Sequence, residues 1–171
     1  DVDGYISNIE PIANTGDLCS DNYKNMSGMA YDGSNSIYFT MDTSSWGMLC
    51  RMDLTTRQIH HVAGNLSKTE DCESGTADEI TLSDGLYDVE VGPDGSIYFA
   101  DQKGECVRRV GLDGTVEIVA GGGTQNPSTS TWKDARSVRI RSPEGLFVTD
   151  DGEIYIADRN EGDLFRVKAD G

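Results

Sequence analysis

Three aspartates occupy equivalent places in the sequence. Asp42, Asp101 and Asp158 each close a short apolar stretch that reads Tyr-Phe-Thr-Met-Asp, Tyr-Phe-Ala-Asp or Tyr-Ile-Ala-Asp. If these carboxylates met around a channel, they could collect a hard cation such as calcium. They could instead cap the turn after each stretch by accepting hydrogen bonds from backbone N–H groups. Because the residue recurs in every copy, capping is the favoured interpretation, and no metal or other cofactor is predicted.

The residue types that usually perform catalysis do not form a recognisable pattern. His60 and His61 are adjacent, so on a strand they would point to opposite faces and could not hold one ion together. The sequence contains no Gly-x-Ser-x-Gly elbow, and the run 121–123 of three glycines precedes no helical pattern of the kind that cradles phosphate. Among the apolar stretches expected to be innermost, the second offers Asp88 and Glu90 but no histidine. We therefore expect this segment to lack a catalytic centre.

The stretches that carry these residues recur at a nearly constant interval. Ile37, Ile97 and Ile154 set intervals of 60 and 57 residues. Each unit holds short apolar stretches rich in Val, Ile, Tyr and Phe and bounded by Gly, Asp or Asn, which indicates strands. Turn sequences such as Gly-Pro-Asp-Gly at 92–95 separate them. The pattern predicts an all-β protein, a β-propeller built of four-stranded antiparallel blades.

The order of strand, Pro-Asp-Gly-like turn, Ile-Tyr-x-Ala-Asp, an apolar-Arg-apolar strand and Val-Ala-Gly resembles NHL repeats over nearly the whole chain. Between blades, Ala77, Ile80 and Leu82 match Ala135, Val138 and Ile140 at a constant offset of 58 residues. The resemblance implies a ring that usually closes with six blades, whereas the chain covers about three. We expect this chain to be an interior segment of a larger propeller; the alternative is a ring completed by a second copy.

The expected organisation follows from these repeats. A last strand of a preceding blade is placed at 1–13, blades at 28–64 and 85–121, an incomplete blade at 144–171, and inter-blade excursions at 14–27, 65–84 and 122–143. In a meander, each excursion lies on the same face as the loop between the second and third strands of its blade. Residues of the two segments can therefore meet.

Four cysteines permit three disulfide pairings. Cys19 and Cys72 lie in excursions, while Cys50 and Cys106 are expected at the start of third strands. Pairing Cys19 with Cys50 and Cys72 with Cys106 would staple each excursion to its own blade. The other pairings place two cysteines farther apart than the roughly 7 Å between Cα atoms that a disulfide allows. Four free thiols in a cytosolic protein are the alternative to disulfides.

Charge and glycosylation motifs restrict the compartment and the partners. The 30 acidic against 14 basic side chains give a net charge of −16, which disfavours nucleic-acid binding, and no apolar run approaches the roughly 18 residues that a membrane helix needs. Asn25 and Asn65 begin N-glycosylation sequons on expected loops, whereas Pro127 excludes Asn126. Together with the cysteine pattern, the two sequons predict an extracellular or cell-surface protein that carries N-glycans.

The residues expected to contact a partner are exposed aromatic and basic side chains in loops. They are Trp46, Trp132, Arg136, Arg139 and Arg141. The predicted function is a non-catalytic interaction or structural module, with protein partners or other copies of the chain. The alternative is a propeller enzyme, amidating-lyase-like or lactonase-like and metal-dependent, with its site in blades outside this segment. An intracellular RNA-binding scaffold fits the charge and the cysteines less well.

Overall fold

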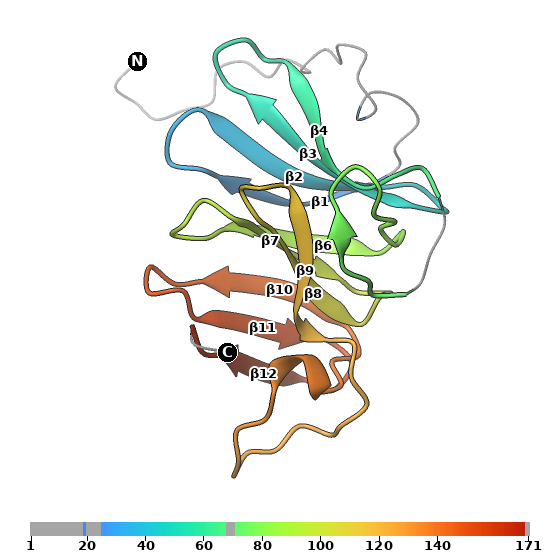
Figure 1. Ribbon diagram of the computed structural model, residues 1–171, viewed down its shortest axis with the longest axis vertical. Helices are drawn as coiled ribbons and strands as arrows, with labels where there is room; N and C mark the ends of the chain where they lie inside the picture. Colours follow the sequence, from blue (N-terminus) through green and yellow to red (C-terminus); the bar gives the residue numbers. More distant parts are fainter. Residues whose placement is uncertain (1–18, 20–24, 68–70, 170–171) are drawn as a thin grey trace, which may run out of the picture.

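The computed structural model describes residue 19, residues 25–67 and residues 71–169. Three antiparallel sheets lie one above another along the long axis of the molecule (Figure 1). We call them blades 1, 2 and 3 in chain order. The predicted all-β fold of antiparallel blades is confirmed, and the expected strand at 1–13 lies outside the described residues.

Each blade is a meander in which strands that follow one another in the chain lie side by side. Blade 1 contains β1 (Asn25–Tyr31), β2 (Ser36–Asp42), β3 (Gly47–Asp53) and β4 (Ile59–Ala63). Blade 2 contains β6 (Leu86–Val91), β7 (Ile97–Asp101), β8 (Cys106–Val110) and β9 (Thr115–Gly121), with β5 (Gly75–Thr76) on the outer edge of β9. Blade 3 contains β10 (Pro143–Val148), β11 (Ile154–Asp158) and β12 (Asp163–Val167), and a 3-10 turn η1 (Ala135–Ser137) precedes it.

The turns between the first two strands follow from their glycines. Gly95 and Gly152 have φ angles of +82° and +85°, a left-handed conformation that only glycine adopts without steric cost. The backbone N–H groups of both glycines also donate hydrogen bonds to the carbonyl oxygens three residues earlier, those of Gly92 and Thr149. The Pro-Asp-Gly-like segments therefore form the tight turns that the sequence predicts.

Alternation along the strands places one side of each blade against its neighbour. Ile97 and Phe99 of β7 face blade 1, in a core shared with Leu49 of β3. Tyr98, between them, faces blade 3 and packs with Ile154 of β11. A shift of one residue in the register of β7 would turn each of these side chains to the opposite face of the blade. The two inter-blade cores therefore set the strand register.

Two excursions differ from the sequence-based boundaries. β1 begins at Asn25 rather than after residue 27, because Asn25 already pairs with Asp42 across the sheet. In the excursion 65–84, Gly75 and Thr76 form β5 and pair with Val116 and Thr115 of β9. Neither extension has an apolar pattern of its own, so the sequence did not indicate them.

The inner strands β1 and β6 are joined through one buried hydroxyl. Thr40 Oγ accepts a hydrogen bond from Gly28 N at 2.9 Å and donates to the Tyr87 carbonyl at 2.5 Å. A Cβ on Gly28 would lie 2.5 Å from that same carbonyl oxygen, so the strands can approach this closely only with glycine there. Blades 1 and 2 therefore depend on Thr40 and Gly28 together.

We expect Thr40→Val to lower the free energy of unfolding by about 1–3 kcal/mol, because it leaves a buried N–H and a buried carbonyl without their partner while keeping the side-chain shape. Urea unfolding followed by circular dichroism measures the change. Thr131→Val is the matched control, since its hydroxyl is exposed and bonds only to Ser128 Oγ in the described structure. Equal stability of the two variants would contradict the bridging role.

Candidate functional site

Two disulfides attach the excursions to their blades. Cys19 joins Cys50 and Cys72 joins Cys106, across sequence separations of 31 and 34 residues, as expected from the sequence. Cys106 begins β8, but Cys50 lies in the middle of β3, opposite Phe39, and not at its start. The expected position of Cys50 is therefore wrong, because β3 begins three residues earlier to pair with the end of β2.

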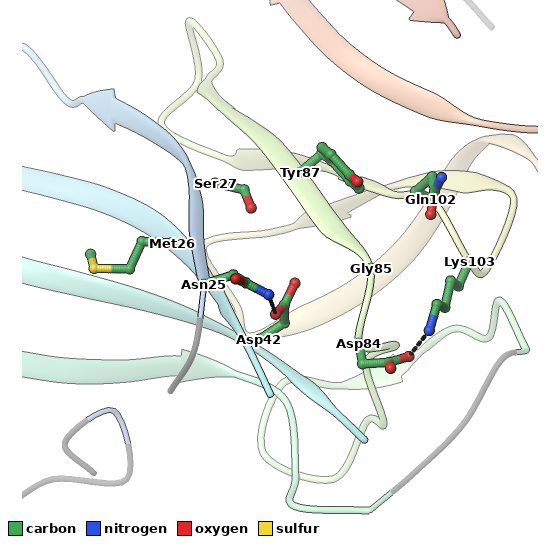
Figure 2. Close-up of a pocket in the computed structure, with 9 residues that line it drawn as sticks. All are labelled: Asn25, Met26, Ser27, Asp42, Asp84, Gly85, Tyr87, Gln102 and Lys103. Carbon is green, nitrogen blue, oxygen red and sulfur yellow. Dashed lines mark hydrogen bonds and ion pairs between the residues drawn. The ribbon is translucent and has the colours of Figure 1, made fainter. Parts of the chain in front are cut away.

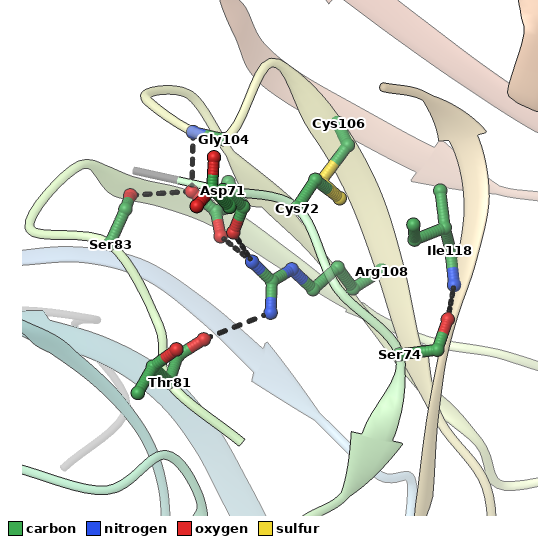
Figure 3. The surroundings of a disulfide bond; sticks show 10 residues. Asp71, Cys72, Ser74, Thr81, Ser83, Gly104, Cys106, Arg108 and Ile118 are labelled. Carbon is green, nitrogen blue, oxygen red and sulfur yellow. Dashed lines mark hydrogen bonds and ion pairs between the residues drawn. A yellow bond between two sulfur atoms is a disulfide. The ribbon is translucent and has the colours of Figure 1, made fainter. Parts of the chain in front are cut away.

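Next to the second disulfide, a buried cation holds the excursion 65–84 in place (Figure 3). The Arg108 side chain is 0% exposed, and its Nη2 lies 2.8 Å from Oδ2 of Asp101, which is equally buried. The same guanidinium donates hydrogen bonds to the carbonyl oxygens of Thr81, at 3.0 Å, and Asp71, at 2.9 Å. Burial lowers the pKa of Arg108, while the carboxylate of Asp101 opposes that shift. We call Ser83, Asp101 and Arg108, with these two carbonyls, the Arg108 network.

Arg108 was not among the predicted site residues, although the sequence contains a signal for its burial. Arg109 occupies the place of Arg51 and Arg166, and all three pair across the sheet with a tyrosine of the second strand. Because neighbouring side chains on a strand point to opposite faces, Arg108 had to point away from Arg109, towards the core.

The strand-end aspartates behave differently in the three blades. Asp101 Oδ1 accepts from Gly104 N at 2.9 Å and from the Ser83 hydroxyl at 2.5 Å. Asp158 Oδ1 accepts from Asn160 N at 2.9 Å, while its Oδ2 accepts from Arg141 N at 2.7 Å. These two aspartates cap the turns that follow their strands.

Within the described residues, Asp42 accepts no such bond from its turn, where the Thr43 hydroxyl accepts from Trp46 N instead. Its Oδ1 accepts from Asn25 Nδ2 at 2.8 Å. Among the described residues, no group of three or more His, Cys, Asp or Glu side chains could hold a metal ion.

A polar pocket of about 540 Å³ opens between blades 1 and 2, beside Asp42 (Figure 2). Lys103 Nζ lies 2.8 Å from Asp84 Oδ1 on one wall, and Asn25 lies on the other. Burial raises the pKa of Asp42, and the nearby Asp84 carboxylate adds to the rise. Asp42 therefore binds a proton more readily than an exposed aspartate does.

The two sequon asparagines lie in different settings. Asn25 is exposed but stands on strand β1, so its expected position on a loop is wrong. Asn65 follows β4 outside the named strands, and its Nδ2 donates to the Glu79 carbonyl at 2.5 Å. The Nδ2 atoms of Asn25 and Asn65, to which a glycan would be attached, each already donate one hydrogen bond within the protein.

His61 and the inner acidic residue Asp88 make contacts within the scaffold. His61 Nε2 lies 2.6 Å from the Gly64 carbonyl, and its Nδ1 lies 3.7 Å from Asp78 Oδ1. Asp88 Oδ2 accepts from Leu146 N at 2.9 Å and so joins β6 to β10. Glu90 lies on the same strand, where burial raises its pKa.

Of the two tryptophans, only Trp132 is largely exposed, at 63% of its surface. Lys168 Nζ lies 4.3 Å and Arg166 Cζ 5.6 Å from the centre of its ring, distances typical of cation–π contacts. A groove of about 750 Å³ runs between β12 and residues 127–133, and these three side chains line it. Trp46 is instead half-buried against the cluster that contains Cys50 and Met48.

The three arginines of the excursion 122–143 do not join Trp132 in this groove. Arg136 Nε lies 3.4 Å from Asp134, Arg141 Nε 2.6 Å from Glu161, and Arg139 donates to the Thr124 carbonyl at 3.4 Å. Of the predicted contact residues, the structure thus places Trp132 with basic residues of β12 and its end, and the three arginines apart from it. No helix in the described part of the chain is long and apolar enough to cross a membrane.

Comparison with known proteins supports the architecture. No family model and no curated protein matches the chain, so membership of the NHL family stays a prediction. Among solved structures, the chain is similar to an auxiliary nutrient binding protein from Bacteroides thetaiotaomicron, with a TM-score of 0.62 and 19% identity over 82% of this chain and 36% of that one. It is also similar to virginiamycin B lyase from Staphylococcus aureus, with a TM-score of 0.55 and 14% identity over 85% and 39%.

A third similarity is to a chain of a nidogen/laminin complex, with a TM-score of 0.56 and 14% identity over 85% of this chain and 45% of that one. The chain therefore spans between 36% and 45% of the length of these three chains. At such identities the similarity concerns the fold alone, which is propeller-like.

Proposed function

We propose that this chain is a non-catalytic interaction module, part of an extracellular or cell-surface glycoprotein, and that it acts by holding loops rigidly for a protein partner. The observation that carries the proposal is the attachment of both described excursion cysteines to their blades by disulfides. Disulfides persist in oxidising compartments, and a cross-linked loop loses less entropy when it binds. The sequons at Asn25 and Asn65 agree with the same compartment.

The proposed contact surface lies on the excursion 122–143. Trp132 offers a large exposed ring, and Arg136, Arg139 and Arg141, which lie outside its groove, add positive charge elsewhere on the same excursion. Aromatic and arginine side chains are the commonest anchors of protein interfaces. The nidogen/laminin structure, in which a chain of similar fold stands in a protein complex, is consistent with such a role.

Intact mass of the native material tests the compartment. We expect no free thiol before reduction, four alkylated cysteines after it, and a loss of mass from Asn25 and Asn65 on glycan removal. Four thiols that label freely, with no glycan, would contradict an extracellular location.

Partner capture tests the binding surface. The secreted protein is immobilised, exposed to medium conditioned by the cells that make it, and compared with Trp132→Ala. Leu112→Ala is the matched control, because Leu112 is an exposed apolar residue on another loop, at 81% exposure. Retention of the partner by both Trp132→Ala and Leu112→Ala, or its loss from both, would contradict a contact through Trp132.

A further inference from the structure

We propose that the polar pocket between blades 1 and 2 binds a primary ammonium group, with the carboxylate of Asp42 as its anchor. We call this space the Asp42 pocket. The inference goes beyond the proposed function, because it assigns a ligand site between two blades rather than a contact surface on the excursion 122–143. It depends neither on a protein partner nor on the compartment.

One additional residue in β2 gives Asp42 an orientation that the other strand-end aspartates do not have. Asp42 comes five positions after Ile37. Asp101 comes four positions after Ile97, and blade 3 has the same shorter interval. Both β2 and β7 pair with the next strand without a register shift, so their side chains alternate regularly. Asp101 therefore lies on the same face of its strand as Ile97, whereas Asp42 lies on the face opposite Ile37.

The additional residue turns Asp42 towards blade 2. It shares that face of β2 with Thr40, whose hydroxyl donates to the Tyr87 carbonyl of β6. Asp101 instead faces the excursion before its own blade and accepts from the Ser83 hydroxyl there. The carboxylate that binds the preceding excursion in blades 2 and 3 thus lines the pocket in blade 1.

The Asp42 carboxylate is buried and has one oxygen without a donor among the described residues. The residue is 6% exposed, and its Oδ1 accepts from Asn25 Nδ2 at 2.8 Å. Figure 2 shows the other oxygen, Oδ2, pointing into the pocket. Burial of a carboxylate with a single hydrogen bond is unfavourable, and it raises the pKa of Asp42. A ligand that donates to Oδ2 would offset this cost.

The charge of the lining favours a cation. Asp42 and Asp84 are its two acidic residues, and Lys103 is its single basic residue. Lys103 Nζ lies 2.8 Å from Asp84 Oδ1, so the ion pair neutralises one carboxylate and leaves the charge of Asp42 uncompensated. A negatively charged ligand is disfavoured at such a site, whereas a positively charged one is attracted.

The amides of the lining add acceptors beside this charge. The Nδ2 of Asn25 is bonded to Asp42, and the Nε2 of Gln102 donates to Ser142 Oγ at 3.0 Å. Both amides are thereby oriented, and the oxygen of each is left to accept. A primary ammonium carries three N–H donors and no acceptor, which complements a carboxylate flanked by amide oxygens.

Butylammonium is the probe, titrated into the oxidised chain produced without glycans and followed through the backbone amide NMR signals of Gly85 and Gln102. We expect saturable shifts, whereas n-butanol, which has a similar shape and no charge, should give none. Asp42→Asn should weaken butylammonium binding about tenfold, because a neutral amide oxygen replaces the carboxylate. Asp78→Asn is the matched control, since it also removes one negative charge but Asp78 is exposed and does not line the pocket.

Two further measurements do not rely on the folding of Asp42→Asn. In the unaltered chain, affinity should fall between about pH 7 and about pH 4, because protonation of Asp42 removes its charge. The loss should begin at a higher pH than for an exposed aspartate, since burial and Asp84 raise the pKa of Asp42 while Lys103 opposes them. Lys103→Met should strengthen binding about threefold, because both carboxylates then face the ligand.

Four results would overturn the site: no saturable shift in the folded chain, equal binding of n-butanol, equal affinity of Asp42→Asn and Asp78→Asn, or an affinity independent of pH. A Gly-Lys-Gly peptide with blocked ends identifies the source of the ammonium group. Binding at least as tight as that of butylammonium supports a lysine side chain of a polypeptide, and weaker binding supports a free small amine. Because the chain carries no glycan and no partner is added, failure of the proposed function would leave these results unchanged.

Discussion

Alanine in place of Arg108 is expected to lower the free energy of unfolding by about 3–5 kcal/mol, the largest effect of any single substitution considered for this chain. The reason is the carboxylate of Asp101, which is fully buried and would lose the guanidinium that lies 2.8 Å away. The substitution also removes the hydrogen bonds to the carbonyls of Asp71 and Thr81, which attach the excursion 65–84 to blade 2. Urea unfolding at neutral pH measures the loss.

The neighbouring Arg109 provides the control. Its side chain is partly exposed and pairs with Asp94 at 2.8 Å, so Arg109→Ala should cost no more than about 1 kcal/mol. The double variant Arg108→Met with Asp101→Asn should recover part of the loss, because an asparagine oxygen can still accept from Ser83 and Gly104 without a charge. Similar stability of Arg108→Ala and Arg109→Ala would show that the buried pair is not needed.

Removal of the disulfide between Cys72 and Cys106 is expected to have the second largest effect. Replacing both cysteines with alanine frees a loop closed over a separation of 34 residues, which by loop entropy lowers the free energy of unfolding by about 4 kcal/mol. The disulfide and the Arg108 network hold the same excursion. Their combined removal should therefore cost less than the sum of the two separate losses.

Chemical denaturation with and without a reducing agent measures this effect. The Cys72→Ala/Cys106→Ala variant should unfold at a lower urea concentration than the oxidised chain. It should also respond less to reduction, because the disulfide between Cys19 and Cys50 is then the one remaining in the described structure. An unchanged midpoint in the variant would contradict a stabilising role for the second disulfide.

Most of the scaffold could be predicted because short-range rules determine it. The alternation around Ile97 and Tyr98 assigns opposite faces, and the structure places those residues in separate inter-blade cores. Gly95 and Gly152 mark tight turns because only glycine adopts their φ angles without cost. These features depend on residues next to one another in the chain.

The candidate contacts were less predictable because they depend on segments distant in the sequence. Trp46 and Trp132 both stand in loops, yet Trp46 packs against the core of blade 1 and Trp132 is exposed beside Lys168. The position of β5 likewise depends on its pairing with β9 and has no signal of its own in the sequence. The amino-acid sequence alone does not distinguish a loop residue that packs against a blade from one that stays exposed, because that difference depends on how the blades and excursions pack together.

The sequence by itself determined the repeat, the strand alternation and the turns, and it favoured the observed pairing of the cysteines. The first three follow from local backbone preference or from the repetition of the pattern in three units, whereas the pairing also requires each excursion to lie beside its blade. The tertiary structure alone decided that Arg108 is buried against Asp101, and that Trp132 lines a groove beside β12 together with Lys168. Both arise where an excursion meets a blade, so their energies depend on desolvation and packing between segments that are far apart in the chain.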